Sequence, residues 1–155
     1  MGVVMFYHLT RSAPVDTLAV NLPRALDQGW RVLIRGTAAA ALDRLDEELW
    51  LKGGDAGFIP HGREGGPQDV DQPVLIGQGA GTNGAKVLAL VDGAAAEDAE
   101  IAAMERVWVL FDGLDEGRLQ AARAQWKAMT GAGHAAQYWS EDSGRWEKKA
   151  ESVAG

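Results

Sequence analysis

Short apolar runs alternate with helical patterns along this chain. Continuous apolar runs of this length are typical of strands covered on both faces, and apolar residues three and four apart are typical of amphipathic helices. The pattern predicts strands at 3–7, 30–36, 73–77, 86–93, 107–113 and 135–139, and helices at 15–28, 38–51, 97–105 and 115–129. This alternation predicts an α/β fold: a three-layer α/β/α sandwich with a largely parallel sheet of five or more strands.

The length of 155 residues corresponds to one domain. We expect this α/β domain to span residues 1–142. The polar segment 143–155, which contains Trp146, is expected to be a partly ordered C-terminal tail. Residues 52–72 hold six glycines and two prolines, so this segment is expected to be a long irregular connection.

The end of the second predicted helix departs from its own apolar pattern. The core stripe of this helix consists of Leu42, Leu45 and Leu49. Trp50 falls roughly 100° from Leu49 on the helical wheel, outside that stripe. Phe58 follows beyond a glycine-rich break. Two interpretations remain open: the two aromatic residues fold back as a small satellite cluster, or they form a docking face for another protein.

Composition excludes several kinds of site. The chain has no cysteine, which excludes thiol catalysis, disulfides and cysteine-based zinc sites. The histidines, His8, His61 and His134, lie far apart and show no metal-binding spacing. A net charge of −7 disfavours direct binding to a phosphate backbone. We expect no secretory signal and no membrane span, and the absence of disulfides is compatible with the cytoplasm.

One glycine-rich segment suggests an alternative function. Gly79, Gly81 and Gly84 fit the G-x-G-x-x-G pattern, but a strand pattern follows where dinucleotide binding needs a helix N-terminus. The spacing also approaches a phosphate-binding loop, with Ala85 in place of its lysine. Asp112 ends an apolar strand and could hold Mg²⁺, although Asp-Gly also favours a turn. The alternative is therefore a nucleotide- or magnesium-dependent enzyme that uses Gly79–Gly84 and Asp112.

The last predicted helix places two cations beside its apolar stripe. This stripe consists of Leu119, Ala122, Trp126 and Met129. Arg123 and Lys127 lie about 40° and 80° from Leu119, and they are neighbours on the helix surface. One interpretation is a pair of solvated side chains with snorkelling stems. The other is a pocket for an acidic peptide, with cations for its carboxylates and the rim of Trp126 for an apolar anchor.

Several segments, taken in order, resemble a known family. They are "FYHL" at the start, "GWRVLI", "LDEELW" followed by "FIPHG", "ARAQWKAM", and the closing "AQYW" with "GRWEKK". Together they resemble the chi subunit of bacterial DNA polymerase III holoenzyme. The resemblance implies a Rossmann-like fold without a nucleotide site and a non-catalytic adaptor in DNA replication. Members of this family bind the acidic C-terminal tail of the single-stranded DNA-binding protein (SSB) and the psi subunit of the clamp-loader complex.

The resemblance also implies two binding sites and a set of partners. The SSB-tail site would consist of Arg123, Lys127, Trp126 and Arg118. In this site Arg118 stands beside Leu119, whose position can be basic in relatives. The psi-binding face would consist of Trp50, Phe58 and Pro60. The resemblance further implies a cytoplasmic protein that is monomeric without its partner, contacts DNA only indirectly, and needs no cofactor or metal.

Overall fold

The computed structural model describes residues 2–53 and 59–153. The described chain forms an eight-stranded sheet with the strand order β3-β4-β2-β5-β6-β1-β7-β8. The strands are β1 (Val3–Leu9), β2 (Val32–Arg35), β3 (Gly62–Arg63), β4 (Val74–Gly77), β5 (Val87–Leu90), β6 (Arg106–Asp112), β7 (Ala135–Ser140) and β8 (Glu147–Ser152). The helices are α1 (Pro14–Asp27), α2 (Ala39–Gly53), α3 (Asp98–Ala103) and α4 (Glu116–Gly131), with a 3-10 turn η1 at Asp69–Asp71.

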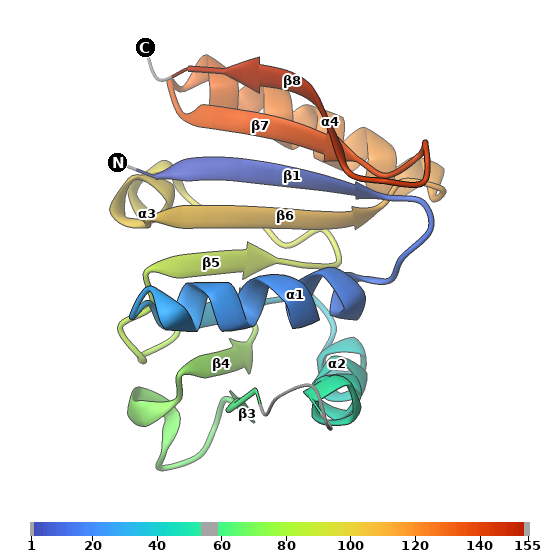
Figure 1. Cartoon of the computed structure of the whole chain (residues 1–155). Helices are drawn as coiled ribbons and strands as arrows, with labels where there is room; N and C mark the ends of the chain where they lie inside the picture. The colour runs from blue at the N-terminus through green and yellow to red at the C-terminus, as the bar shows by residue number, and fades with distance from the viewer. Residues whose placement is uncertain (1, 54–58, 154–155) are drawn as a thin grey trace.

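The sheet is parallel from β3 to β7, and β8 runs antiparallel to β7. Helices α1 and α2 lie on one face of the sheet, and α3 and α4 lie on the other (Figure 1). This architecture confirms the predicted α/β sandwich with a largely parallel sheet. Every strand and helix predicted from the sequence is present with slightly shifted ends, and β3 and β8 are additional.

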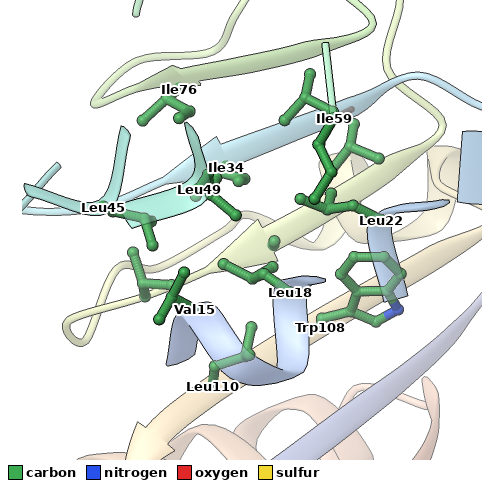
Figure 2. Close-up of a cluster of buried hydrophobic side chains, with 14 of the residues drawn as sticks. Val15, Leu18, Leu22, Ile34, Leu45, Leu49, Ile59, Ile76, Trp108 and Leu110 are labelled. Atoms are coloured by element: carbon green, nitrogen blue, oxygen red, sulfur yellow. The ribbon is translucent and has the colours of Figure 1, made fainter. Parts of the chain in front are cut away.

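The core on the α1–α2 side is built from the predicted helical stripes. Leu18 and Leu22 of α1 point at the sheet beside Trp108 of β6 (Figure 2). Leu42 and Leu49 are fully buried from α2, and Leu45 is nearly so. Burying such side chains contributes roughly 1.5–3 kcal/mol each. The α2 stripe is therefore confirmed, and it fixes which side of α2 faces solvent.

The core on the opposite face joins α4 to β1 and β6. Ala122 and Met129 of α4 are buried there, whereas Leu119 and Trp126 are partly buried. They pack with Phe6 and other sheet residues of this face. The predicted α4 stripe therefore faces the sheet, with Trp126 at its edge.

The C-terminal segment differs from the expected tail. Residues Glu147–Ser152 form β8, which extends the sheet beyond β7. Its sequence, EKKAES, lacks an apolar pattern because β8 is the edge strand and most of its side chains are exposed. Charged side chains on an edge strand also oppose unwanted pairing with other chains. The sheet thus continues into the segment that we expected to lie outside the domain.

The glycine-rich segment after β4 crosses the sheet to β5, on the far side of β2. Gly81 has a φ of +73°, and a Cβ built on it would lie 2.8 Å from Cδ2 of Leu33. The buried amide of Asn83 donates hydrogen bonds to the carbonyls of Val32 and Gln72, at 3.1 and 3.0 Å. The glycines therefore serve a tightly packed crossover.

No helix in residues 2–53 and 59–153 is long and apolar enough to span a membrane.

Candidate functional site

A hollow of about 420 Å³ opens between α4 and the β7–β8 end of the sheet. Four elements and the turn after β7 supply its walls. Its lining residues are His8, Arg123, Trp126, Tyr138, Ser140, Asp142, Lys149 and Ala150. Because these residues are widely separated in the sequence, the hollow exists only through the pairing of β1 with β7 and of β7 with β8.

Aromatic rings form the apolar part of the hollow. The ring of Trp126 lies edge-on to Phe6 at a centroid distance of 5.4 Å and to Tyr138 at 5.8 Å. The hydroxyl of Tyr138 is hydrogen-bonded to Nδ1 of His8 at 2.8 Å. Edge-to-face aromatic pairs stabilise their arrangement by about 0.5–1.5 kcal/mol beyond the area they bury. Trp126 is therefore held in place before any ligand arrives.

The hollow also carries an uncompensated cation. Arg123 is exposed, and it forms no hydrogen bond or salt bridge with any residue that the structure describes. Lys149 lies 3.9 Å from Asp142 and 4.0 Å from Glu147, measured from Nζ to the nearest carboxylate oxygen. In a chain of net charge −7, a guanidinium without a carboxylate partner beside aromatic rings suits an anionic ligand.

The pKa shifts of two lining residues show that the charge of Arg123 reaches into the hollow. Burial lowers the pKa of His8, and Arg123 lowers it further, while Asp142 and Asp112 act in the opposite direction. Burial raises the pKa of Tyr138, and Arg123 partly opposes that rise. The hollow therefore contains a neutral phenol and a histidine that resists protonation, next to a fixed positive charge.

The structure brings together some of the residues expected for the SSB tail. Arg123 and Trp126 both line the hollow. Lys127 is exposed on α4 but does not line it. Arg118 is at the other end of α4, where its Nη1 donates a 2.6 Å hydrogen bond to the carbonyl of Asp92. Of the expected set, Arg123 and Trp126 share the hollow, whereas Lys127 and Arg118 do not line it.

Six of the lining residues were not predicted from the sequence; besides Ser140, Asp142 and Ala150, they include three with ring or cationic side chains, His8, Tyr138 and Lys149. The segments "FYHL", "AQYW" and "GRWEKK" contain them and carry the family resemblance, but nothing in their spacing places them beside α4. Their positions depend on strand register. Phe6 pairs with Tyr138, and His8 pairs with Ser140.

The residues expected for psi lie at the opposite end of the sheet. Trp50 is 47% exposed at the end of α2, and its ring lies 4.2 Å from that of His61. His61 is buried, with hydrogen bonds to the carbonyls of Ile59 and Asp46. Pro60 is partly buried, and Phe58 lies outside the described residues. Packing on His61 agrees with a local cluster, and the exposed half of Trp50 leaves surface for docking.

The segments that suggested an enzyme have other roles in the fold. Strand β5 begins at Val87, directly after the glycine-rich segment, so no helix N-terminus follows Gly84. Oδ1 of Asp112 accepts the N–H of Leu114 at 2.9 Å, as the turn interpretation predicts. Among the described residues, no group of three or more His, Asp or Glu side chains could hold a metal ion. The geometry does not favour the nucleotide- or magnesium-dependent alternative.

Fold and site define a Rossmann-like α/β domain whose clearest feature is a surface hollow with a cation beside aromatic rings. A sequence model of the family described as DNA polymerase III chi subunit, HolC, matches residues 1–137, and the chain belongs to this family. The family supports an accessory role in DNA replication. A search of curated proteins found no significant match. Strand β8 lies beyond the matched residues.

Proposed function

We propose that this protein is a non-catalytic accessory subunit of DNA polymerase III that links the clamp-loader complex, through psi, to the acidic C-terminal tail of SSB. The observation that carries the proposal is the position of Arg123, which is exposed beside Trp126 in the hollow on α4 and forms no ion pair within residues 2–53 and 59–153. A cation next to an aromatic wall matches a peptide that is acidic and ends in an aromatic residue.

The chemistry of the hollow supports this type of ligand. A terminal aromatic side chain would pack against Trp126 and Tyr138, and its carboxylate would pair with Arg123. A volume of about 420 Å³ is enough for a short peptide end. The rings are already held by their mutual packing, so binding orders few side chains and loses little conformational entropy.

The proposal assigns psi to the surface around Trp50 and Pro60; Phe58, implied by the family resemblance, lies outside the described residues. Trp50 offers a half-exposed ring next to the β3 edge, and Leu51 beside it is 81% exposed. Apolar rings of this kind dominate binding at protein interfaces. Two faces at opposite ends of the sheet suit an adaptor, because each partner reaches its own edge (Figure 1).

Other parts of the proposal follow from its partners. The protein acts in the cytoplasm, is monomeric without its partner, and contacts DNA only through SSB and the polymerase assembly. The net charge of −7 supports indirect contact, since it repels a phosphate backbone. The proposed activity needs no cofactor or metal.

A peptide titration tests the proposed SSB site. The probe is a fluorescent acidic peptide ending in Pro-Phe with a free carboxylate, and an amidated peptide is the control ligand. We expect micromolar-class binding that weakens up to about 0.3 M sodium chloride, because salt screens charge pairs. Arg123→Ala should weaken binding about tenfold or more, as loss of a charge-assisted hydrogen bond requires. Arg44→Ala, which removes the same charge from α2, is the matched control.

Lys127→Ala is titrated alongside, because Lys127 belongs to the set implied by the family. Full-strength binding in both Arg123→Ala and Lys127→Ala would overturn the site.

The psi face is tested separately, by co-purification of the protein with psi from its own cell. The Trp50→Ala variant should no longer co-purify with psi. The control variant Leu114→Ala should still co-purify with psi, because it truncates a 76% exposed side chain elsewhere. Retention by both variants would remove Trp50 from the interface.

A further inference from the structure

Strand β8 presents two consecutive residues, Lys149 and Ala150, to the same hollow. Side chains of a regular strand alternate between the two faces of a sheet, so neighbours would normally point apart. Here Tyr138 of β7 pairs with Ala150, but Trp139 pairs with Lys148, so Lys149 is an extra residue. An extra residue of this kind is a β-bulge, which re-aims a side chain. The bulge therefore places Lys149 on the α4 side of the sheet.

The side chain of Asp142 is the nearest anion to Lys149 inside this hollow. Their charged atoms lie 3.9 Å apart, at the limit of a salt bridge, and the side chains are 59% and 45% exposed. A pair so long and so exposed is held weakly, with typical strengths of about 0.2–1 kcal/mol. The carboxylate of Asp142 thus occupies the position beside Lys149 that a ligand carboxylate would take. Its ion pair with Lys149 is weak, so a ligand could replace it.

We propose that Lys149 is the second cation of the peptide site, acting with Arg123, and that Asp142 is a built-in competitor which an acidic ligand displaces from Lys149. This inference rests on the proposed function of the same hollow. It adds a cation from β8, beyond the residues matched by the family, to the one from α4. Cations from two elements favour a ligand with two carboxylates over one with a single charge.

The neighbouring residue provides a matched control for Lys149. Lys148 lies next to it on β8, loses the same charge on truncation, and pairs with Glu151 at 3.2 Å rather than lining the hollow. Using the same peptide probe, Lys149→Ala should weaken binding about threefold to tenfold, in the range between an exposed pair and a charge-assisted hydrogen bond. Lys148→Ala should leave binding unchanged. Both side chains are over 40% exposed, so both variants should fold.

A second pair of variants tests the competitor role. Asp142→Asn should tighten binding about twofold to fivefold, because the exchanged ion pair is weak. Glu151→Gln, which removes the same charge beside Lys148, should have no effect. The gain from Asp142→Asn should disappear in a Lys149→Ala background, since the two residues act on one another.

The possible outcomes distinguish a failure of the roles of Lys149 and Asp142 from a failure of the proposed peptide site. Equal binding by Lys149→Ala and Lys148→Ala, with Arg123→Ala still impaired, would overturn the role of Lys149 and leave the peptide site standing. A gain from Asp142→Asn that persists without Lys149, or no gain at all, would overturn the competitor role. Full binding by Arg123→Ala and Lys127→Ala would remove the peptide site itself, and the inference with it.

Discussion

Glu141 binds Ser12 through both carboxylate oxygens, with the Ser12 hydroxyl 2.7 Å from Oε1 and the Ser12 backbone N–H 2.9 Å from Oε2. The backbone N–H groups of Thr10 and Arg11 also donate to Oε2, each at 3.1 Å. Glu141 is itself buried, directly after β7. One carboxylate thereby ties the turn between β1 and α1 to the segment that leads into Asp142 and the hollow.

Replacing this carboxylate should destabilise the protein. Glu141→Gln keeps the shape, but a neutral amide replaces the carboxylate that accepts from the N–H groups of Thr10, Arg11 and Ser12. Hydrogen bonds to a charged group contribute about 1.5–3 kcal/mol and those between neutral groups about 0.5–1.5 kcal/mol, so the loss should be about 1 kcal/mol or more. Urea denaturation near neutral pH should show this loss, whereas Glu47→Gln on the exposed side of α2 should change the free energy of unfolding by less than about 0.5 kcal/mol. Equal stability of the two variants would contradict the role of Glu141.

Stability should fall as the solution is acidified from neutral pH. Burial alone would raise the pKa of Glu141, but its hydrogen bonds to Ser12 and the neighbouring N–H groups together lower it. The hydrogen bond from Arg35 lowers the pKa of Glu100. A lowered carboxyl pKa stabilises the fold above the ordinary value of 4.5, and this stabilisation is lost as pH falls through the folded pKa.

His8 should contribute an earlier loss in the same experiment. Burial lowers its pKa below 6.5, so the fold favours the neutral ring, and stability declines as pH falls from about 6.5 towards the folded pKa. Urea midpoints measured at a series of pH values should therefore decline in two stages. His8→Gln should remove the first stage and retain the second. A profile that is flat between neutral pH and about 5 would contradict the assignment to His8.

The two αL glycines of the β4–β5 crossover should respond differently to alanine. Gly81 and Gly84 have φ values of +73° and +69°, so both substitutions impose the same backbone strain of about 1–3 kcal/mol. A Cβ on Gly81 would also meet Leu33 at 2.8 Å, whereas a Cβ on Gly84 would meet nothing within 4 Å. Gly81→Ala should therefore be the less stable variant by about 1 kcal/mol or more, measured by urea denaturation. Equal losses would show that Leu33 yields freely.

Arg118 should support the fold rather than the peptide site. Arg118→Ala removes the 2.6 Å hydrogen bond to the carbonyl of Asp92, which should cost about 0.5–1.5 kcal/mol. Peptide affinity should stay within about twofold of the unmodified protein, because Arg118 does not line the hollow. Urea denaturation measures the stability, and the peptide titration measures the affinity. Arg123→Ala should show the opposite pattern, with reduced affinity and unchanged stability. A tenfold loss of affinity in Arg118→Ala would return Arg118 to the site.

The parts of the fold that could be predicted are those whose environment leaves a regular trace in the sequence. The parallel strands are covered by helices on both faces, so they read as apolar runs, and Leu42, Leu45 and Leu49 reveal the buried side of α2. Strand β8 leaves no such trace. It is the exposed edge strand of the sheet, and its residues are mostly charged or polar because they contact solvent rather than a core.

The same distinction separates the residues of the site that could be predicted from those that could not. Arg123 and Trp126 lie three residues apart on one helix, so a helical wheel relates them without knowledge of the fold. Tyr138 and His8 are brought together by strand register over 130 positions of chain. The side of the sheet on which Lys149 lies is set by a β-bulge, and it is opposite to the side that regular alternation along β8 would predict. Helical neighbours can be predicted from sequence alone, whereas contacts set by strand pairing need the structure.

The strand order also gives the sheet the role of a spacer. The end of α2 lies beside the β3 edge, and the hollow lies at the β7–β8 edge, so most of the width of the sheet separates them (Figure 1). The seven spacings between eight strands, at about 4.8 Å each, give the whole sheet a width of roughly 34 Å. Ligands held at the two edges would not touch each other, yet each would be confined near the other at high effective concentration. A rigid sheet can thus raise the avidity of an assembly without any direct contact between the molecules it joins.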